Sequence, residues 1–114
     1  MSSPELTAID LIAYEKRIGG LNRVATVLEE LSEKIDKTKL LNQAKDSFAL
    51  SYIQRLGYLL DKILHKKSLA APLKGWLKKQ KPFQTPLKRD VPTKGFPIDT
   101  DWNIIINTEV ESEL

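Results

Sequence analysis

Four prolines lie close together near the C-terminal end of this 114-residue chain, at Pro82, Pro86, Pro92 and Pro97. Proline lacks a backbone N–H and its ring clashes with the preceding helical turn, so this stretch can form neither a continuous helix nor a central β-strand. We therefore expect an irregular Pro-rich arm over residues 81–100. Any long helices must lie before it.

Residues 1–80 carry the apolar spacing of helices. Side chains recur three or four positions apart in two clear series: Leu21, Val24, Leu28, Leu31 and Ile35, then Ile53, Leu56, Leu60 and Ile63. This spacing places each series on one helical face. We predict about five helices forming a small bundle, over residues 4–17, 21–35, about 40–44, 51–64 and 69–77.

Residues that favour helix ends stand at the expected positions. Ser3 can cap the first helix and the Gly19–Gly20 pair can end it, because glycine adopts a positive φ at little cost. Asn22, Asp36 and Ser68 are predicted to cap the second, third and fifth helices. Gly57 lies inside the fourth helix, where glycine costs about 1 kcal/mol relative to alanine. We expect it to admit a neighbouring helix at close range.

The segment "DWNIIINTEV" predicts a C-terminal strand over residues 101–111, because Trp102, Ile104, Ile106 and Val110 alternate with polar residues. A lone strand cannot satisfy its backbone hydrogen bonds. Its partner is either the arm, near Phe83 or Val91, or another chain, which would make a homodimer. The predicted fold is a mainly α (α+β) single domain over 1–114: helical bundle 1–80, Pro-rich basic arm 81–100 and C-terminal strand 101–111.

Composition excludes several classes of protein. The 41% hydrophobic content suits one compact domain, and the absence of cysteine excludes disulfides and thiolate chemistry. No apolar run approaches the roughly 20 residues of a membrane span, and the N-terminal residues lack the basic-then-apolar pattern of a signal peptide. We therefore expect a cytoplasmic protein without membrane contact.

Catalytic chemistry is poorly supported. His65 stands among lysines at a helix end, no triad can be assembled around it, and Gly19–Gly20 lacks the Lys-Ser/Thr of a phosphate loop. Four carboxylates flank the predicted strand, namely Asp99, Asp101, Glu109 and Glu111. They do not complete the pattern of a magnesium nuclease because the accompanying lysine is missing, so a solvated terminus is the favoured interpretation. We expect no catalytic, cofactor or metal residues.

Asp10 interrupts the apolar run "AIDLI" in the first helix. A half-buried carboxylate needs a partner, and Arg17, Arg23 and Arg55 are the candidates. We expect one ion pair that holds the first helix against the bundle.

Charge is distributed unevenly along the chain. Residues 62–94 carry ten basic groups against Asp90 alone, whereas the last twenty residues carry five acids and no base. Lys74, Lys78 and Lys81 share one helical side, near Lys79, Lys88 and Arg89. Three interpretations remain open for this basic segment: contacts to nucleic-acid phosphates, attraction of an acidic protein partner, or simple solvation.

Four stretches in series resemble a known family: "SSPELTAIDLI", "RIGGLNRVATVLEEL", "YIQRLGYLLDKI" and "WNIIINTEV". In order and spacing they are similar to the C-terminal domain of AbiEi-type antitoxins of bacterial type IV toxin–antitoxin (abortive infection) systems. The resemblance spans most of residues 3–111. The family's N-terminal winged helix-turn-helix domain, which binds operator DNA, has no counterpart in this sequence.

The resemblance implies a non-enzymatic domain that neutralises a cognate nucleotidyltransferase-like toxin, directly or functionally. The alternative is a fragment of a transcriptional regulator whose basic surface assists operator DNA binding. The expected interaction residues are first the arginines within the matching motifs and then the basic residues that follow: Arg17, Arg23, Arg55, Lys74, Lys78, Lys79, Lys81, Lys88 and Arg89.

Overall fold

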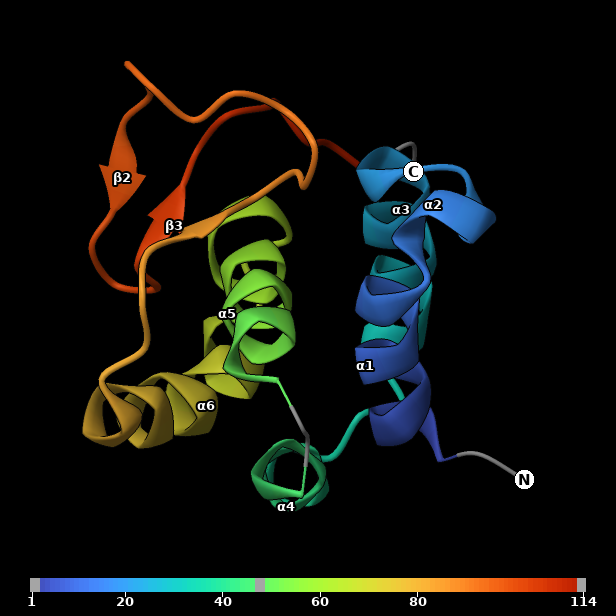
Figure 1. Cartoon of the computed structure of the whole chain (residues 1–114). Helices are drawn as coiled ribbons and strands as arrows, with labels where there is room; N and C mark the ends of the chain where they lie inside the picture. Colours follow the sequence, from blue (N-terminus) through green and yellow to red (C-terminus); the bar gives the residue numbers. More distant parts are fainter. Residues whose placement is uncertain (1–2, 47–48, 113–114) are drawn as a thin grey trace.

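The computed structural model describes residues 3–46 and 49–112, and six α-helices lie within them (Figure 1). They are α1 (Pro4–Ala13), α2 (Glu15–Ile18), α3 (Leu21–Ser32), α4 (Lys37–Lys45), α5 (Leu50–Tyr58) and α6 (Lys67–Gln80). A π-helical turn, Leu59–Ile63, continues α5, and three short strands follow α6. The strands are β1 (Thr85–Pro86), β2 (Ile98–Asp99) and β3 (Ile104–Ile105). The prediction of a mainly α (α+β) fold is confirmed.

Some predicted helix ends are confirmed and others are wrong. The Ser3 Oγ accepts the Leu6 N–H at 3.1 Å, the Asp36 carboxylate caps α4, and Gly19 ends α2 with φ +116°. Asn22 does not cap α3, because that helix already begins at Leu21 after Gly20. Ser68 lies inside α6, whose N-cap is Lys66. The first predicted helix is divided at residue 14 into α1 and α2.

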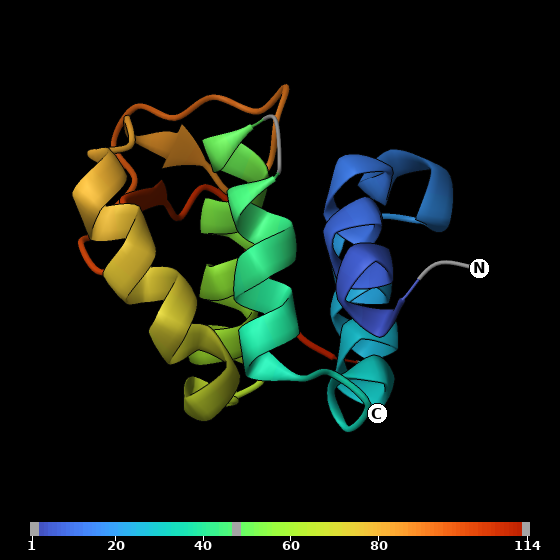
Figure 2. The ribbon, with the colours of Figure 1, turned by 90° about the horizontal axis from the view of Figure 1, so that it is seen from below.

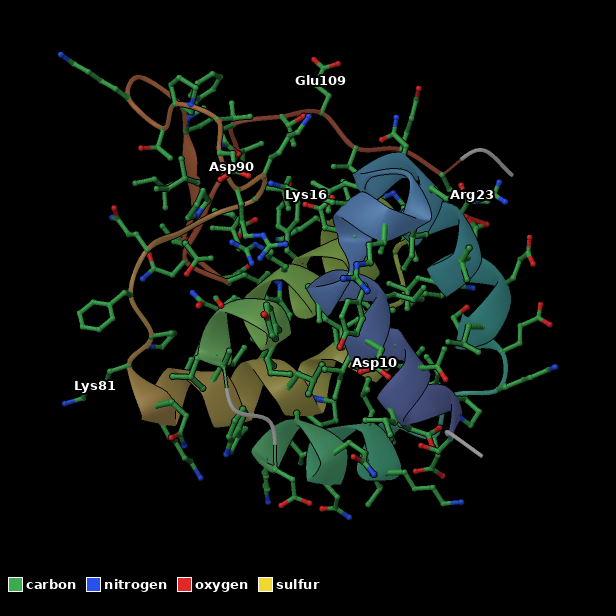
Figure 3. The ribbon with its side chains drawn as sticks, turned by 45° about the vertical axis from the view of Figure 1, so that its right-hand side comes forward. Asp10, Lys16, Arg23, Lys81, Asp90 and Glu109 are labelled. Carbon is green, nitrogen blue, oxygen red and sulfur yellow. The ribbon has the colours of Figure 1, made fainter. Side chains whose placement is uncertain are left out.

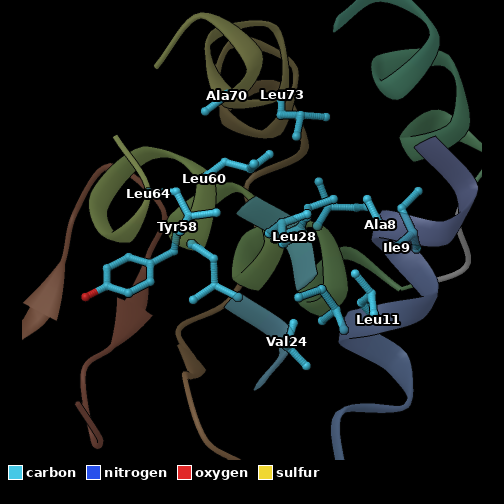
Figure 4. Packing of buried hydrophobic residues seen from close by; sticks show 14 of the residues in the cluster. Ala8, Ile9, Leu11, Val24, Leu28, Tyr58, Leu60, Leu64, Ala70 and Leu73 are labelled. Atoms are coloured by element: carbon cyan, nitrogen blue, oxygen red, sulfur yellow. The ribbon is translucent and has the colours of Figure 1, made fainter. Parts of the chain in front are cut away.

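Helix α5 lies at the centre of the fold. It packs against α1 on one side and against α6 on another, and β3 also contacts it. Its side chains Ile53 and Leu56, and Leu60 of the π-helical turn, are completely buried. Figure 4 shows part of this core, where Leu28 of α3 lies between α1 and the end of α5. The apolar faces predicted from the three-and-four spacing therefore meet in one hydrophobic core.

Gly57 receives a side chain from the far end of the chain. A Cβ added at this position would lie 2.0 Å from Cζ3 of Trp102 and 2.3 Å from its Cη2. Trp102 is 1% exposed, and its indole N–H donates to the buried Asp61 carboxylate at 3.0 Å. The prediction that Gly57 admits a neighbouring helix is wrong. It admits an indole ring, because only glycine leaves room for the ring against the α5 backbone.

The C-terminal strand is shorter than predicted and is paired within the chain. β3 lies between β1, to which it is parallel, and β2, to which it is antiparallel. The strand consists of Ile104–Ile105 alone. Asn103, the residue before it, has a φ of +54°, which lies outside the extended region and interrupts the strand. Both edges of β3 are paired with the arm. The predicted homodimer through this strand therefore loses its basis.

Candidate interaction surface

Helices α4 and α6 lie side by side and form one face of the molecule (Figure 2). Neither helix contains an acidic residue, although Asp36 and Asp46 cap the two ends of α4. Six lysines of this helix pair are exposed: Lys37, Lys39, Lys45, Lys67, Lys78 and Lys79. The pair therefore presents positive charge. We call these six residues the α4–α6 lysine face.

Sequence reasoning identified the α6 lysines but missed the three on α4. Residues 1–61 have nearly balanced charge as a whole, because acids on neighbouring helices offset Lys37, Lys39 and Lys45. The local sequence "KTKLLNQAK" between Asp36 and Asp46 carried the signal. Counting charge helix by helix would have found it.

Helix α6 and its C-cap residue, Lys81, carry four of the predicted interaction residues. Lys78, Lys79 and Lys81 are exposed, and none of the ion pairs among the described residues involves them. Lys74 is different: it is half-buried, and its Nζ lies 3.4 Å from Asp101 Oδ1. Lys78, Lys79 and Lys81 therefore remain available to a partner, whereas Lys74 already neutralises a carboxylate.

The acidic residues around β3 are held by lysine. Lys62 Nζ lies 2.8 Å from Asp101 Oδ2 and 3.9 Å from carboxylate oxygens of both Asp61 and Asp99. The hydrogen bond to Asp101 raises the pKa of Lys62, and the same bond lowers the pKa of Asp101. Lys62 thus ties the π-helical turn to the C-terminal segment.

The solvated terminus that the sequence suggested is confirmed for Glu109 and Glu111, which are exposed, but it is wrong for Asp99 and Asp101, which pair with lysine. The Asp99 side chain is only 12% exposed, and its Oδ1 accepts a hydrogen bond from the backbone N–H of Trp102 at 3.1 Å. Burial, followed by the charge of Asp99, raises the pKa of Tyr58 nearby. Within residues 3–46 and 49–112, no group of three His, Cys, Asp or Glu side chains is arranged to hold a metal ion. Asp99 and Asp101 therefore join the C-terminal segment to Lys62 of the π-helical turn.

The three arginines predicted as first-choice interaction residues occupy different environments. Arg23 is exposed on α3, on the opposite side of the view in Figure 3 from Lys81. Arg17 is exposed and lies 5.7 Å from the centre of the Tyr14 ring, a cation–π distance. Arg55 is 5% exposed, and its Nε donates to the Pro86 carbonyl at 3.0 Å. Its guanidinium therefore holds the arm and is not presented to a partner.

Arg89 and Lys88, on the arm, complete the predicted set. Arg89 is half-buried; burial and then the positive charge of Arg89 lower the pKa of Arg55, while Glu15 raises it. Lys88 is exposed, and its backbone is fixed because its N–H and carbonyl both bond the Asn107 side-chain amide at 2.9 Å. The structure therefore brings only part of the predicted set to one surface, at the end of α6.

The ion pair expected for Asp10 is wrong. Among the described residues, no ion pair joins Asp10 to Arg17, Arg23 or Arg55. Asp10 is half-buried at the edge of a groove between α1, α4 and α5, which Tyr14 also lines. The carboxylate can thus reach solvent from the groove, and burial alone does not force it to pair.

The structure defines a helical domain with exposed lysines and lysine-bound carboxylates, and a fold of this kind does not by itself define a function. Comparison with known proteins identifies the protein family. The family model of the AbiEi antitoxin C-terminal domain matches residues 1–62, and the chain belongs to this family. No curated protein and no solved structure matches the chain.

The family match confirms the resemblance found in the sequence, over a shorter range. It covers α1 to α5 and most of the π-helical turn, whereas "WNIIINTEV" lies outside it. Among the described residues, no helix has the length and apolar content required to cross a membrane.

Proposed function

We propose that this chain is the antitoxin domain of a type IV toxin–antitoxin system, and that it neutralises a co-encoded nucleotidyltransferase-like toxin in the cytoplasm without being an enzyme. The observation that carries the proposal is the match of residues 1–62 to the AbiEi antitoxin C-terminal domain. The same membership supports a phage-defence role through abortive infection.

The surface supports a function by contact. Lys78, Lys79 and Lys81 are exposed and outside the described ion pairs, so a partner that binds them displaces water but breaks no salt bridge. The carboxylates near β3 are different, because Lys62 and Lys74 already bind them. A partner is therefore expected to approach the positive end of α6.

Growth rescue tests the proposal. The toxin encoded next to this chain is expressed from an inducible promoter, with or without the chain, and colony formation is counted. We expect the chain to restore growth, and we expect a Leu56→Asp variant to fail, because a charge at a completely buried position unfolds the core. Toxicity that persists with full expression of the folded wild-type chain would refute the proposal.

A second candidate function is a part in operon autorepression, in which the basic surface assists operator DNA binding. The α4–α6 lysine face favours it, because two adjacent helices without acidic residues suit a phosphate backbone. A gel shift with the DNA upstream of the operon tests this role. Binding must weaken steeply with salt and must weaken further in a Lys37→Glu, Lys39→Glu variant. Equal affinity of both proteins would exclude the α4 lysines from this role.

A further inference from the structure

The groove between α1, α4 and α5 has a volume of about 400 Å³. Apolar and aromatic side chains form much of its wall, namely Leu6, Ile9, Ala13, Tyr14 and Tyr52. Leu6 is 36% exposed and Tyr14 is 53% exposed, so apolar surface of this groove faces water. Pockets of this volume bind small ligands, and one aromatic side chain therefore fits inside.

Two carboxylates lie in the same groove. Asp10 and Asp46 both line it, and the described lining residues include no lysine or arginine. Neither carboxylate takes part in the ion pairs of residues 3–46 and 49–112. Asp46 is also the C-cap of α4, where the helix terminus carries a partial negative charge of its own. The groove therefore suits an apolar group with positive charge beside it.

A group of this kind stands at the end of α6. Phe83 is 90% exposed, although its backbone is held by buried side chains. The Gln54 amide donates to the Phe83 carbonyl at 2.9 Å, and the Thr85 hydroxyl lies 3.2 Å from the same oxygen. The ring thus projects from a fixed support, and a partner that binds it orders little additional backbone.

Positive charge accompanies this ring. Lys79 and Lys81 precede Phe83 closely in sequence, and both are exposed and outside the described ion pairs. Figure 3 shows Lys81 extending away from the body of the molecule, well apart from Asp10. The corner that carries Phe83 therefore does not reach the groove of its own copy.

We propose that the Phe83 ring of one copy inserts into the groove between α1, α4 and α5 of a second copy, with Lys79 and Lys81 near Asp10 and Asp46. A ring enclosed by a pocket supplies most of the binding energy of such a contact, and the charges around it set the orientation. The two surfaces differ, so the interface is heterologous and the copies associate head to tail. This self-association goes beyond the proposed antitoxin function and does not depend on it.

A small aromatic ammonium ion is the competing occupant, because apolar walls and carboxylates suit it as well. Such a ligand would leave the fixed, exposed ring of Phe83 without a role. A second copy accounts for both surfaces, since the groove supplies apolar walls and negative charge while the corner supplies an apolar ring and positive charge.

Sedimentation equilibrium from about 10 μM to about 1 mM protein tests the self-association, because contacts built on one ring are weak. We expect the average mass of the wild-type chain to rise with concentration. Phe83→Ala should weaken association about 30-fold, whereas Phe96→Ala, which removes another exposed ring, should match the wild type. Melting temperatures should agree, because both rings are exposed.

A groove variant, Leu6→Lys with Asp46→Lys, should also remain monomeric, because it places positive charge where the lysines of the second copy must approach. Both positions are exposed, so the fold should tolerate the change. Glu33→Lys is the matched control: Glu33 is the exposed C-cap of α3, as Asp46 is of α4, and its reversal should leave self-association unchanged.

Mixing the two monomeric variants gives the sharpest result. Phe83→Ala keeps an intact groove and the groove variant keeps an intact ring, so an equimolar mixture should form a 1:1 dimer and nothing larger. A wild-type chain that stays monomeric throughout, or a mixture that stays monomeric while the wild type associates, would overturn the proposal. Titration of the wild type with benzylammonium covers the competing occupant. A wild-type monomer that binds this probe, with binding lost in the groove variant, would assign the groove to a small cation and overturn the proposal as well.

Discussion

Replacing Gly57 by alanine tests the contact that joins the two ends of the fold. The added methyl carbon would lie 2.0 to 2.5 Å from three carbons of the Trp102 ring, closer than any van der Waals contact. The α5 backbone cannot yield, so the indole must leave its site. Loss of a buried tryptophan costs about 3–5 kcal/mol, and alanine returns about 1 kcal/mol of helix propensity. We expect the free energy of unfolding to fall by about 2–4 kcal/mol.

Urea unfolding followed by tryptophan fluorescence measures this change. The chain has two tryptophans, so the experiment is done with Trp76→Phe in both proteins, which leaves Trp102 as the reporter. In a chain of this size the melting temperature should fall by roughly 8–16 °C. The native emission of Trp102 should also shift to longer wavelength in Gly57→Ala, because the ring becomes hydrated.

Gly75→Ala is the matched control. Gly75 lies inside α6, and a Cβ at that position meets no atom within 4 Å. Alanine should therefore stabilise the protein by about 0.5–1 kcal/mol, through helix propensity alone. If Gly57→Ala behaves like Gly75→Ala, the indole does not occupy the space beside Gly57 and the reasoning is refuted.

Three further predictions concern polar contacts and use urea midpoints as the measurement. Asp61→Ala should cost about 1–3 kcal/mol because it leaves the Trp102 indole N–H buried without an acceptor, whereas Asp61→Asn should cost less. Arg55→Met should cost about 1–3 kcal/mol through loss of the donor to a carbonyl of the arm; an unchanged midpoint would mean that water replaces the guanidinium. The Lys62 hydrogen bond lowers the pKa of Asp101, so its stabilisation is present above the unfolded pKa of about 3.9 and is lost as pH falls through the lower folded pKa. On acidification from pH 5, the free energy of unfolding should therefore fall less in Lys62→Met than in the wild type. The difference should be under about 1 kcal/mol, because the ion pair is partly exposed. Equal acid sensitivity of the two proteins would contradict this assignment.

The helices were predictable because their evidence is local. Apolar spacing and caps such as Ser3 and Asp36 act within a few residues, and the structure confirms them. The partner of Gly57 was not predictable, because the contact depends on a tryptophan beyond the arm. The sequence marks a glycine that needs space but not the group that fills it.

The predicted strand over residues 101–111 failed for a related reason. Alternating apolar and polar residues indicate that side chains alternate between core and solvent, and a chain with turns satisfies this pattern as well as a long strand does. Asn103 adopts a left-handed backbone conformation, which the neighbouring residues in the sequence do not predict. At the interaction surface, Lys78 and Lys81 are exposed, whereas the burial of Arg55 depends on the Pro86 carbonyl, which lies far from it in sequence.

The packing of Trp102 against Gly57 has a consequence for folding during synthesis. Translation completes α1 to α5 first, and the side of α5 that the indole covers remains exposed until residue 102 has left the ribosome and the arm has packed against the helices. Exposed apolar surface on unfinished chains promotes aggregation. Nascent copies of this protein are thus vulnerable until late in synthesis, and ribosome-associated chaperones have a defined patch to shield.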